Sequence, residues 1–249
     1  QAEARPEHVV FTFEHPQFGD RQISYGDLWL KANRLAAYWD ESGLKAGDKV
    51  AILMRNYPEF VYALIAASIN GVVVVPIDPR TRGEKLGYQL RDSGAIMAMC
   101  TDDLIDRLEE VREQTGVRRL LVLTPTGPVK RGRVSDDIGE VLSSSRPLVA
   151  QRITALNAPH QIIYTSGTTG DPKGVVLDLM RALAPKFIAQ MIADVKPDDV
   201  LYTGLSLTHG NAQTVTCFPQ IWLGNHDFFS DRFTKTRLWD ICRKFGCTT

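Results

Sequence analysis

The sequence predicts an α/β fold in which mainly parallel sheets are flanked by helices. Short apolar, β-branched runs alternate with longer segments whose apolar residues recur at helical spacing. Some runs, such as the four valines at 72–75, are apolar on both faces, as in parallel strands covered on both sides. Apolar residues make up 44% of the 249 residues and charged residues 23%, which is ordinary for a globular protein with a sizeable core.

The first 123 residues alternate regularly between the two kinds of element and form one predicted α/β subdomain. Ser24 and Asp27 fit a capping box, Pro58 suits a first helical turn, and Gly43 and Gly94 suit helix ends. Strands are predicted at 8–13, 21–23, 49–54, 72–75, 96–100 and 120–123, and helices from about 25 to 42, 58 to 70, 82 to 92 and 101 to 114.

The composition changes between residues 124 and 150, where Pro, Gly, Ser and Arg dominate and no apolar period persists. We predict a surface linker there, followed at 151–249 by a second α/β part. Its predicted elements are a strand pair around 162–177, a helix at 178–193, a strand at 200–203, a helix after 210, a strand at 227–229 and a last helix at about 238–245.

The bulk chemistry argues against several classes of function. The 29 basic and 29 acidic residues balance, so neither nucleic-acid binding nor membrane-surface attraction is expected. We find no apolar stretch of membrane-spanning length and no signal-peptide pattern. The four cysteines lack metal-site or redox spacing and are predicted to be free thiols in a cytoplasmic protein. The oligomeric state is left open, a homo-oligomer included.

A loop rich in glycine and hydroxyl groups carries the strongest chemical signal. Two apolar runs, 162–164 and 175–177, are predicted as buried strands around ten residues, Thr165 to Gly174. Four of these carry hydroxyls, three are glycines that allow positive φ or close approach, and Lys173 adds a mobile positive charge. Consecutive backbone N–H groups can form a concave anion site, so the loop is predicted to hold a polyphosphate.

Three other kinds of loop also combine glycines with hydroxyl-bearing residues. An ordinary hairpin loop is the simplest, since many Gly/Ser/Thr clusters are only that. The P-loop pattern fails because Lys173 precedes Gly174 and Val175 follows, which leaves no hydroxyl in place for Mg²⁺. A hydrolase elbow, G-x-S-x-G, fails because Tyr164, not glycine, stands two residues before Ser166.

Residues 164–174, Tyr-Thr-Ser-Gly-Thr-Thr-Gly-Asp-Pro-Lys-Gly, resemble the AMP-binding signature of the adenylate-forming superfamily, which comprises acyl-CoA synthetases, luciferases and the adenylation domains of peptide synthetases. Residues 23–28 and 71–79 resemble two of its scaffold segments. The resemblance implies the large N-terminal domain of an acyl-CoA synthetase. It also implies the small-molecule substrates, a carboxylic acid, ATP and CoA, with the acid activated as an acyl-adenylate and passed on as a thioester.

The resemblance also implies the site. ATP phosphates would be held by the loop (Thr165, Ser166, Gly167, Thr168, Thr169, Gly170 and Lys173), with Lys173 orienting the triphosphate for in-line attack. One hydroxyl would lie near Mg²⁺, and Thr169 is our candidate among them. His209 stands in 205–210, which is similar to a segment lining the acyl pocket, although Ser206 and Thr208 depart from its usual pattern.

The remaining polar candidates receive structural roles. His160 and His226 have no motif around them, Asp178 suits a helix start, and Arg181 and Arg237 are predicted as solvated surface charges. Residues after His209 have a weak similarity to carnitine/crotonobetaine–CoA ligases, and the acid itself is left open. The superfamily's later adenine, ribose and catalytic-lysine segments do not occur here, so we expect a partial, truncated domain that is inactive alone. The alternative is a truncated, non-catalytic nucleotide-binding or interaction module.

Overall fold

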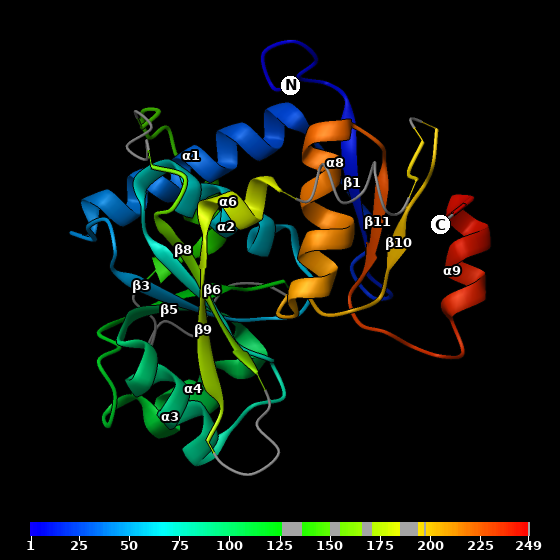
Figure 1. The fold of residues 1–249 in the computed structure, drawn as a ribbon. Helices are drawn as coiled ribbons and strands as arrows, with labels where there is room; N and C mark the ends of the chain where they lie inside the picture. The colour runs from blue at the N-terminus through cyan, green and yellow to red at the C-terminus, as the bar shows by residue number, and fades with distance from the viewer. Residues whose placement is uncertain (126–135, 150–154, 166–170, 185–193, 197, 249) are drawn as a thin grey trace. The chain divides into compact units, whose positions relative to one another are not determined.

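The computed structural model describes the chain except residues 126–135, 150–154, 166–170, 185–193, 197 and 249. It divides into two compact units (Figure 1). The first unit comprises Gln1–Leu30, Arg55–Pro58 and Met180–Thr249, and the second comprises Lys31–Met54 and Glu59–Leu179. The predicted parts 1–123, 124–150 and 151–249 follow chain order, whereas each of these units draws on separate stretches of the chain.

The second unit is built on a seven-stranded sheet with the order β7-β6-β5-β3-β4-β8-β9. All neighbouring strands are parallel except β8 and β9, which form an antiparallel pair. The strands are β3 (Lys49–Leu53), β4 (Val73–Pro76), β5 (Ala95–Thr101), β6 (Arg119–Leu123), β7 (Asp136–Asp137), β8 (Pro159–Thr165) and β9 (Lys173–Asp178). The predicted mainly parallel sheet is confirmed here.

Helices cover the sheet of the second unit because its central strands are apolar on both faces. Alternate strand residues, such as Leu53, Val75 and Cys100, form a core with Leu86 and Leu108 from α3 and α4, which lie together at one face (Figure 1). The helices are α1 (Tyr25–Glu41) and α2 (Pro58–Asn70), which both begin in the first unit, η1 (Asp102–Leu104), α3 (Gly83–Ser93), α4 (Ile105–Arg112) and α5 (Ile138–Ser143).

The structure of the second unit differs from two predictions made from the sequence. The predicted linker contains β7 and α5, whose Ile138 is fully buried and whose cap Asp137 accepts a hydrogen bond from the Glu140 N–H. A helix of only six residues shows too short an apolar period to be recognised from sequence. The strand pair around the loop was predicted to be buried, but Val175 and Val176 are exposed because β9 is the last strand in the sheet order.

The first unit contains a four-stranded sheet with the order β10-β11-β1-β2, in which only β1 and β2 are antiparallel. Its strands are β1 (Val9–Glu14), β2 (Arg21–Ser24), β10 (Tyr202–Thr203) and β11 (Asp227–Ser230). Its helical segments are α6 (Leu179–Leu183), the π-helical η2 (Ala212–Cys217), α8 (Phe218–Leu223) and α9 (Leu238–Phe245).

Aromatic side chains pack on both faces of this smaller sheet. Phe229 stacks on Phe13, with ring centroids 4.9 Å apart, and meets Phe11 edge-on at 5.4 Å. On the opposite face Phe228 stacks on Phe245 of α9 at 4.2 Å. Consecutive strand residues point to opposite faces, so α8 and α9 cover different sides of the sheet (Figure 1). Within the described ranges no helix is long and apolar enough to cross a membrane.

Candidate functional site

The β8–β9 hairpin of the second unit carries the two described ends of the predicted phosphate loop. Thr165 and Lys173 are cross-strand neighbours, and the Thr165 hydroxyl donates to the Lys173 carbonyl at 3.4 Å. Both side chains are exposed. Ser166, Gly167, Thr168, Thr169 and Gly170 lie outside the described residues. The hairpin therefore brings the first hydroxyl and the lysine of the motif together at the two ends of the loop.

Gly174 does not have a positive φ, which corrects that part of its predicted role, and it packs closely against its own hairpin. A Cβ atom there would lie 2.9 Å from Ile162 Cγ2 and 3.3 Å from the ring of Tyr164, its cross-strand partner. The aromatic ring thus lies against the bare backbone of the glycine, an arrangement that stabilises a strand glycine near a sheet edge. The predicted approach of Gly174 to a ligand stays a prediction.

Tyr164 fastens the base of the loop to α3. Its hydroxyl donates to Asp92 Oδ2 at 2.6 Å and to the Gln89 carbonyl at 3.2 Å. Burial raises the pKa of Tyr164, and the Asp92 carboxylate raises it further, so the phenol remains a donor at physiological pH. The sequence places Tyr164 in the motif, but its partner on α3 depends on tertiary structure.

We expect Tyr164→Phe to loosen this attachment by ~1 kcal/mol, the usual net value of one hydrogen bond. The measurement is a double-mutant cycle of Tyr164→Phe with Asp92→Ala, read from urea unfolding. The two substitutions should be less than additive, because either one removes the same contact. Additive effects would show that the Tyr164–Asp92 bond contributes nothing to the hairpin.

His209 lies in the first unit, in the turn between β10 and η2. Its backbone N–H donates to the Ser206 carbonyl at 3.0 Å, and its side chain is exposed. The chain after it adopts π-helical geometry over Ala212–Cys217, a form that is rare and frequent at functional sites.

Asn56, which lies between β3 and α2, contacts this turn, a role that the sequence does not predict. It is buried, and its Nδ2 donates to the carbonyls of Leu205 and Ser230 at 2.9 Å each. Its Oδ1 accepts the Leu207 N–H at 2.8 Å. From the other side Gln213 donates to the Leu207 carbonyl at 2.7 Å. Asn56 and Gln213 therefore hold the 205–209 turn. The only sequence signal for this role is that Asn56 is a polar residue two positions before Pro58.

Two histidines have the structural roles expected for them. His160 is buried in the second unit, where its Nε2 bonds with the Ser68 hydroxyl and the Leu64 carbonyl, both at 3.0 Å. His226 Nε2 bonds with the Thr12 hydroxyl at 2.7 Å in the first unit. Burial lowers the pKa of both imidazoles, which favours their neutral forms.

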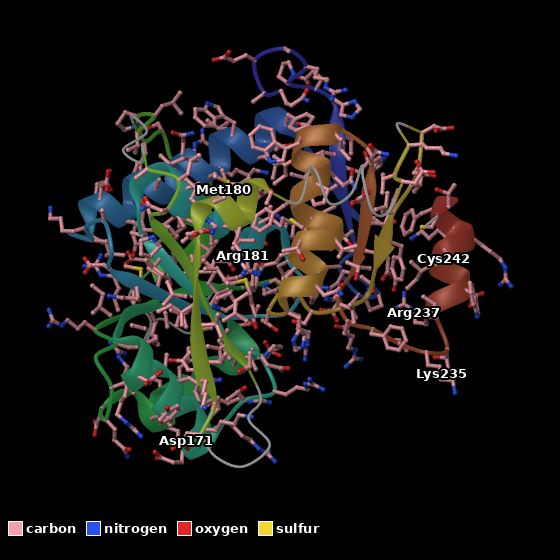
Figure 2. The ribbon with its side chains drawn as sticks, in the orientation of Figure 1. Asp171, Met180, Arg181, Lys235, Arg237 and Cys242 are labelled. Atoms are coloured by element: carbon pink, nitrogen blue, oxygen red, sulfur yellow. The ribbon has the colours of Figure 1, made fainter. Side chains whose placement is uncertain are left out.

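Two charged side chains of the first unit have buried surroundings. Arg237, which Figure 2 labels, is predicted to be a solvated surface charge, but it pairs with the buried Glu14. Asp227 is fully buried, and no side-chain hydrogen bond to its carboxylate is found among the described residues. Burial raises the pKa of Asp227 well above its usual range, and the Leu201 backbone lowers it by a smaller amount.

The described residues contain no cluster of three or more His, Cys, Asp or Glu side chains that could hold a metal ion. The candidate Mg²⁺ residue, Thr169, belongs to the part of the loop outside the description. All four cysteines are free thiols, as predicted; Cys100 and Cys217 are buried, and Cys242 and Cys247 are partly exposed.

Known proteins with similar sequences are acyl-CoA ligases. The chain is 26% identical over 230 residues to the crotonobetaine/carnitine–CoA ligase of Salmonella typhimurium, a match that covers 92% of this chain and 44% of that protein. It is 31% identical over 236 residues to a medium/long-chain-fatty-acid–CoA ligase of Mycobacterium tuberculosis, covering 90% of this chain and 36% of the relative. The chain thus spans less than half the length of these relatives.

Solved structures agree on the fold. The O-succinylbenzoate coenzyme A synthetase of Bacillus subtilis, in complex with AMP, matches with a TM-score of 0.79 at 21% identity, over 99% of this chain and 46% of that chain. A putative long-chain-fatty-acid CoA ligase of Rhodopseudomonas palustris matches with a TM-score of 0.83 at 20% identity, over 99% of this chain and 59% of that one.

The family model described as "AMP-binding enzyme" matches residues 1–249. The predicted resemblance to the N-terminal part of acyl-CoA synthetases is therefore confirmed, and this chain belongs to the AMP-binding enzyme family.

Proposed function

We propose that this chain is the phosphate-binding part of an AMP-forming acid–thiol ligase. In that reaction a carboxylate attacks the α-phosphate of ATP, pyrophosphate leaves, and CoA sulfur displaces AMP from the acyl-adenylate to give a thioester. The observation that supports this best is the β8–β9 hairpin, which places Thr165 and Lys173 side by side at the ends of a hydroxyl- and glycine-rich loop. The choice of acid remains open, and the proposed location is the cytoplasm.

Lys173 is proposed to bind the β- and γ-phosphates with the loop residues Thr165 to Gly170. An exposed ammonium on an edge strand can follow a mobile triphosphate, since it is a compact charge on a flexible stem. Neutralising and orienting the phosphates assists in-line attack through positioning and charge stabilisation. Mg²⁺ would supply further charge neutralisation, with Thr169 as the proposed protein hydroxyl beside it.

His209 is proposed to line the acyl side of the site. Its turn is held by buried hydrogen bonds from Asn56 and Gln213, so the backbone that carries His209 is well fixed while the side chain is accessible. An imidazole at such a place can contact a carboxylate as a neutral donor or as a cation.

Lys173→Ala is expected to weaken Mg·ATP binding by ~1–3 kcal/mol, the range for a hydrogen bond to a charged group. Isothermal titration calorimetry on the full chain measures this directly. Lys45→Ala is a matched control, because Lys45 is also exposed in the second unit but lies in the turn between α1 and β3. If Lys173→Ala and Lys45→Ala weaken Mg·ATP binding equally, Lys173 acts only through the net charge of the chain and not through a direct contact with the phosphates.

A second measurement separates binding from chemistry. We expect this chain alone to show no carboxylate-dependent ATP–pyrophosphate exchange, because the proposed reaction needs segments of the relatives beyond the part it matches. Exchange at enzyme-like rates would refute the proposed inactivity. Absence of ATP binding in a folded chain would instead favour a non-catalytic interaction module.

A further inference from the structure

Two cysteines occupy the paired positions of the motif that ends α9. Gly246 has a left-handed φ of 63°, and its N–H donates to the Arg243 carbonyl at 3.3 Å. The next N–H, that of Cys247, donates to the Cys242 carbonyl at 2.9 Å. These are the two hydrogen bonds of a Schellman motif, in which the side chains at the positions of Cys242 and Cys247 contact each other.

This backbone geometry places the side chains of Cys242 and Cys247 next to each other. Both side chains are partly exposed to solvent (Figure 2 labels Cys242 on α9), and the Cys242 thiol contributes to a raised pKa of Cys247. The Cys242–Cys247 backbone hydrogen bond holds the two residues next to each other, as a short cross-link requires. Cys100 and Cys217, by contrast, are each fully buried.

We infer that Cys242 and Cys247 form a dithiol that a low-molecular-weight disulfide converts into an intramolecular disulfide at the end of α9. One cysteine thiolate attacks the reagent disulfide, forms a mixed disulfide and releases one reagent thiol. The second cysteine then attacks the protein sulfur of that mixed disulfide and releases the other reagent thiol. Overall the protein loses two electrons and two protons, and one reagent disulfide becomes two thiols.

The bridge would act on the sheet of the first unit through the following residue. Thr248 donates its N–H to the Val200 carbonyl at 2.9 Å, and its hydroxyl accepts the Val200 N–H at 3.0 Å. The same hydroxyl donates to Asp199 Oδ1 at 2.9 Å. A Cys242–Cys247 disulfide would restrict the backbone at Cys247, the residue immediately before Thr248 and its contacts next to β10.

Acidity sets the rate of this exchange. Burial, with a smaller contribution from the Cys242 thiol, raises the pKa of Cys247 to about 12. The thiolate is the attacking species, so attack by Cys247 should be slow at pH 7 and about tenfold faster for each pH unit above it.

The test is incubation of the folded chain with oxidised glutathione at pH 8, followed by intact mass measurement and peptide mapping. We expect the mass to fall by two hydrogen atoms, with a Cys242–Cys247 bridge and no retained glutathione. Cys242→Ser and Cys247→Ser should each abolish this loss, whereas Cys100→Ser, at a buried thiol, should leave it unchanged.

A comparison in urea separates preorganisation from ordinary thiol reactivity. At one ratio of oxidised to reduced glutathione, the bridged fraction relative to the dithiol should be at least tenfold higher in the folded chain than in the unfolded one. Hydrogen exchange at the Thr248 amide should also slow on bridging. Equal ratios in both states, a stable mixed disulfide, or a bridge to Cys100 or Cys217 would overturn the inference.

Discussion

Asn56→Ala is expected to lower the free energy of unfolding by ~3 kcal/mol, the upper end of the cost of leaving buried polar groups unsatisfied. The substitution removes three side-chain hydrogen bonds at once. It leaves the carbonyls of Leu205 and Ser230 and the N–H of Leu207 without this partner. Because two of those groups belong to the turn that carries His209, the loss should also loosen that turn.

Urea unfolding measures the stability, and hydrogen exchange at the Leu207 amide reports the turn itself. Asn56→Asp should fall between wild type and Asn56→Ala, since a carboxylate still accepts from Leu207 but cannot donate to the two carbonyls. Asn211→Ala is the matched control, because Asn211 is exposed and makes no side-chain cap. Unchanged exchange at Leu207 in Asn56→Ala would show that the turn is held by other contacts.

Asp227 is expected to make the chain less stable as pH rises, in contrast to most carboxylates. Its pKa is raised in the folded state by burial, so above the ordinary value of 3.8 the folded chain binds more protons than the unfolded chain. The free energy of unfolding should then fall by up to ~1.4 kcal/mol per pH unit until Asp227 ionises in the folded state. Its contribution is fully favourable only below pH ~4.

The Asp227→Asn variant isolates this effect. Buried His160 and half-buried His226 have lowered pKa values, so they act in the opposite sense and reduce stability as pH falls below their ordinary value of 6.5. The histidine contributions are the same in wild type and in Asp227→Asn, so they cancel when the free energies of unfolding are subtracted. Between pH 4 and 7 the free energy of unfolding of wild type should fall relative to that of the variant. A difference that does not depend on pH would mean that Asp227 is solvated or paired.

Local patterns were sufficient for most helices and strands. The apolar run at 72–75 predicts a strand covered on both faces, and the structure has the buried β4 there; Gly94, with its left-handed φ of 68°, ends α3 where expected. The phosphate loop stays a prediction: glycines, hydroxyls and a lysine within ten residues favour an anion site by their chemistry. By contrast, α5 was missed because six residues show too short an apolar period.

The α/β class and the family signature could be predicted from the sequence, since each depends on residues that are neighbours in the chain. Which distant groups meet depends on tertiary packing. Tyr164 finds Asp92 on α3, Asn56 finds Leu205 and Ser230, and Glu14 finds Arg237. These contacts join residues far apart in the chain, and no local period or spacing encodes them, because they arise only when strands and helices pack.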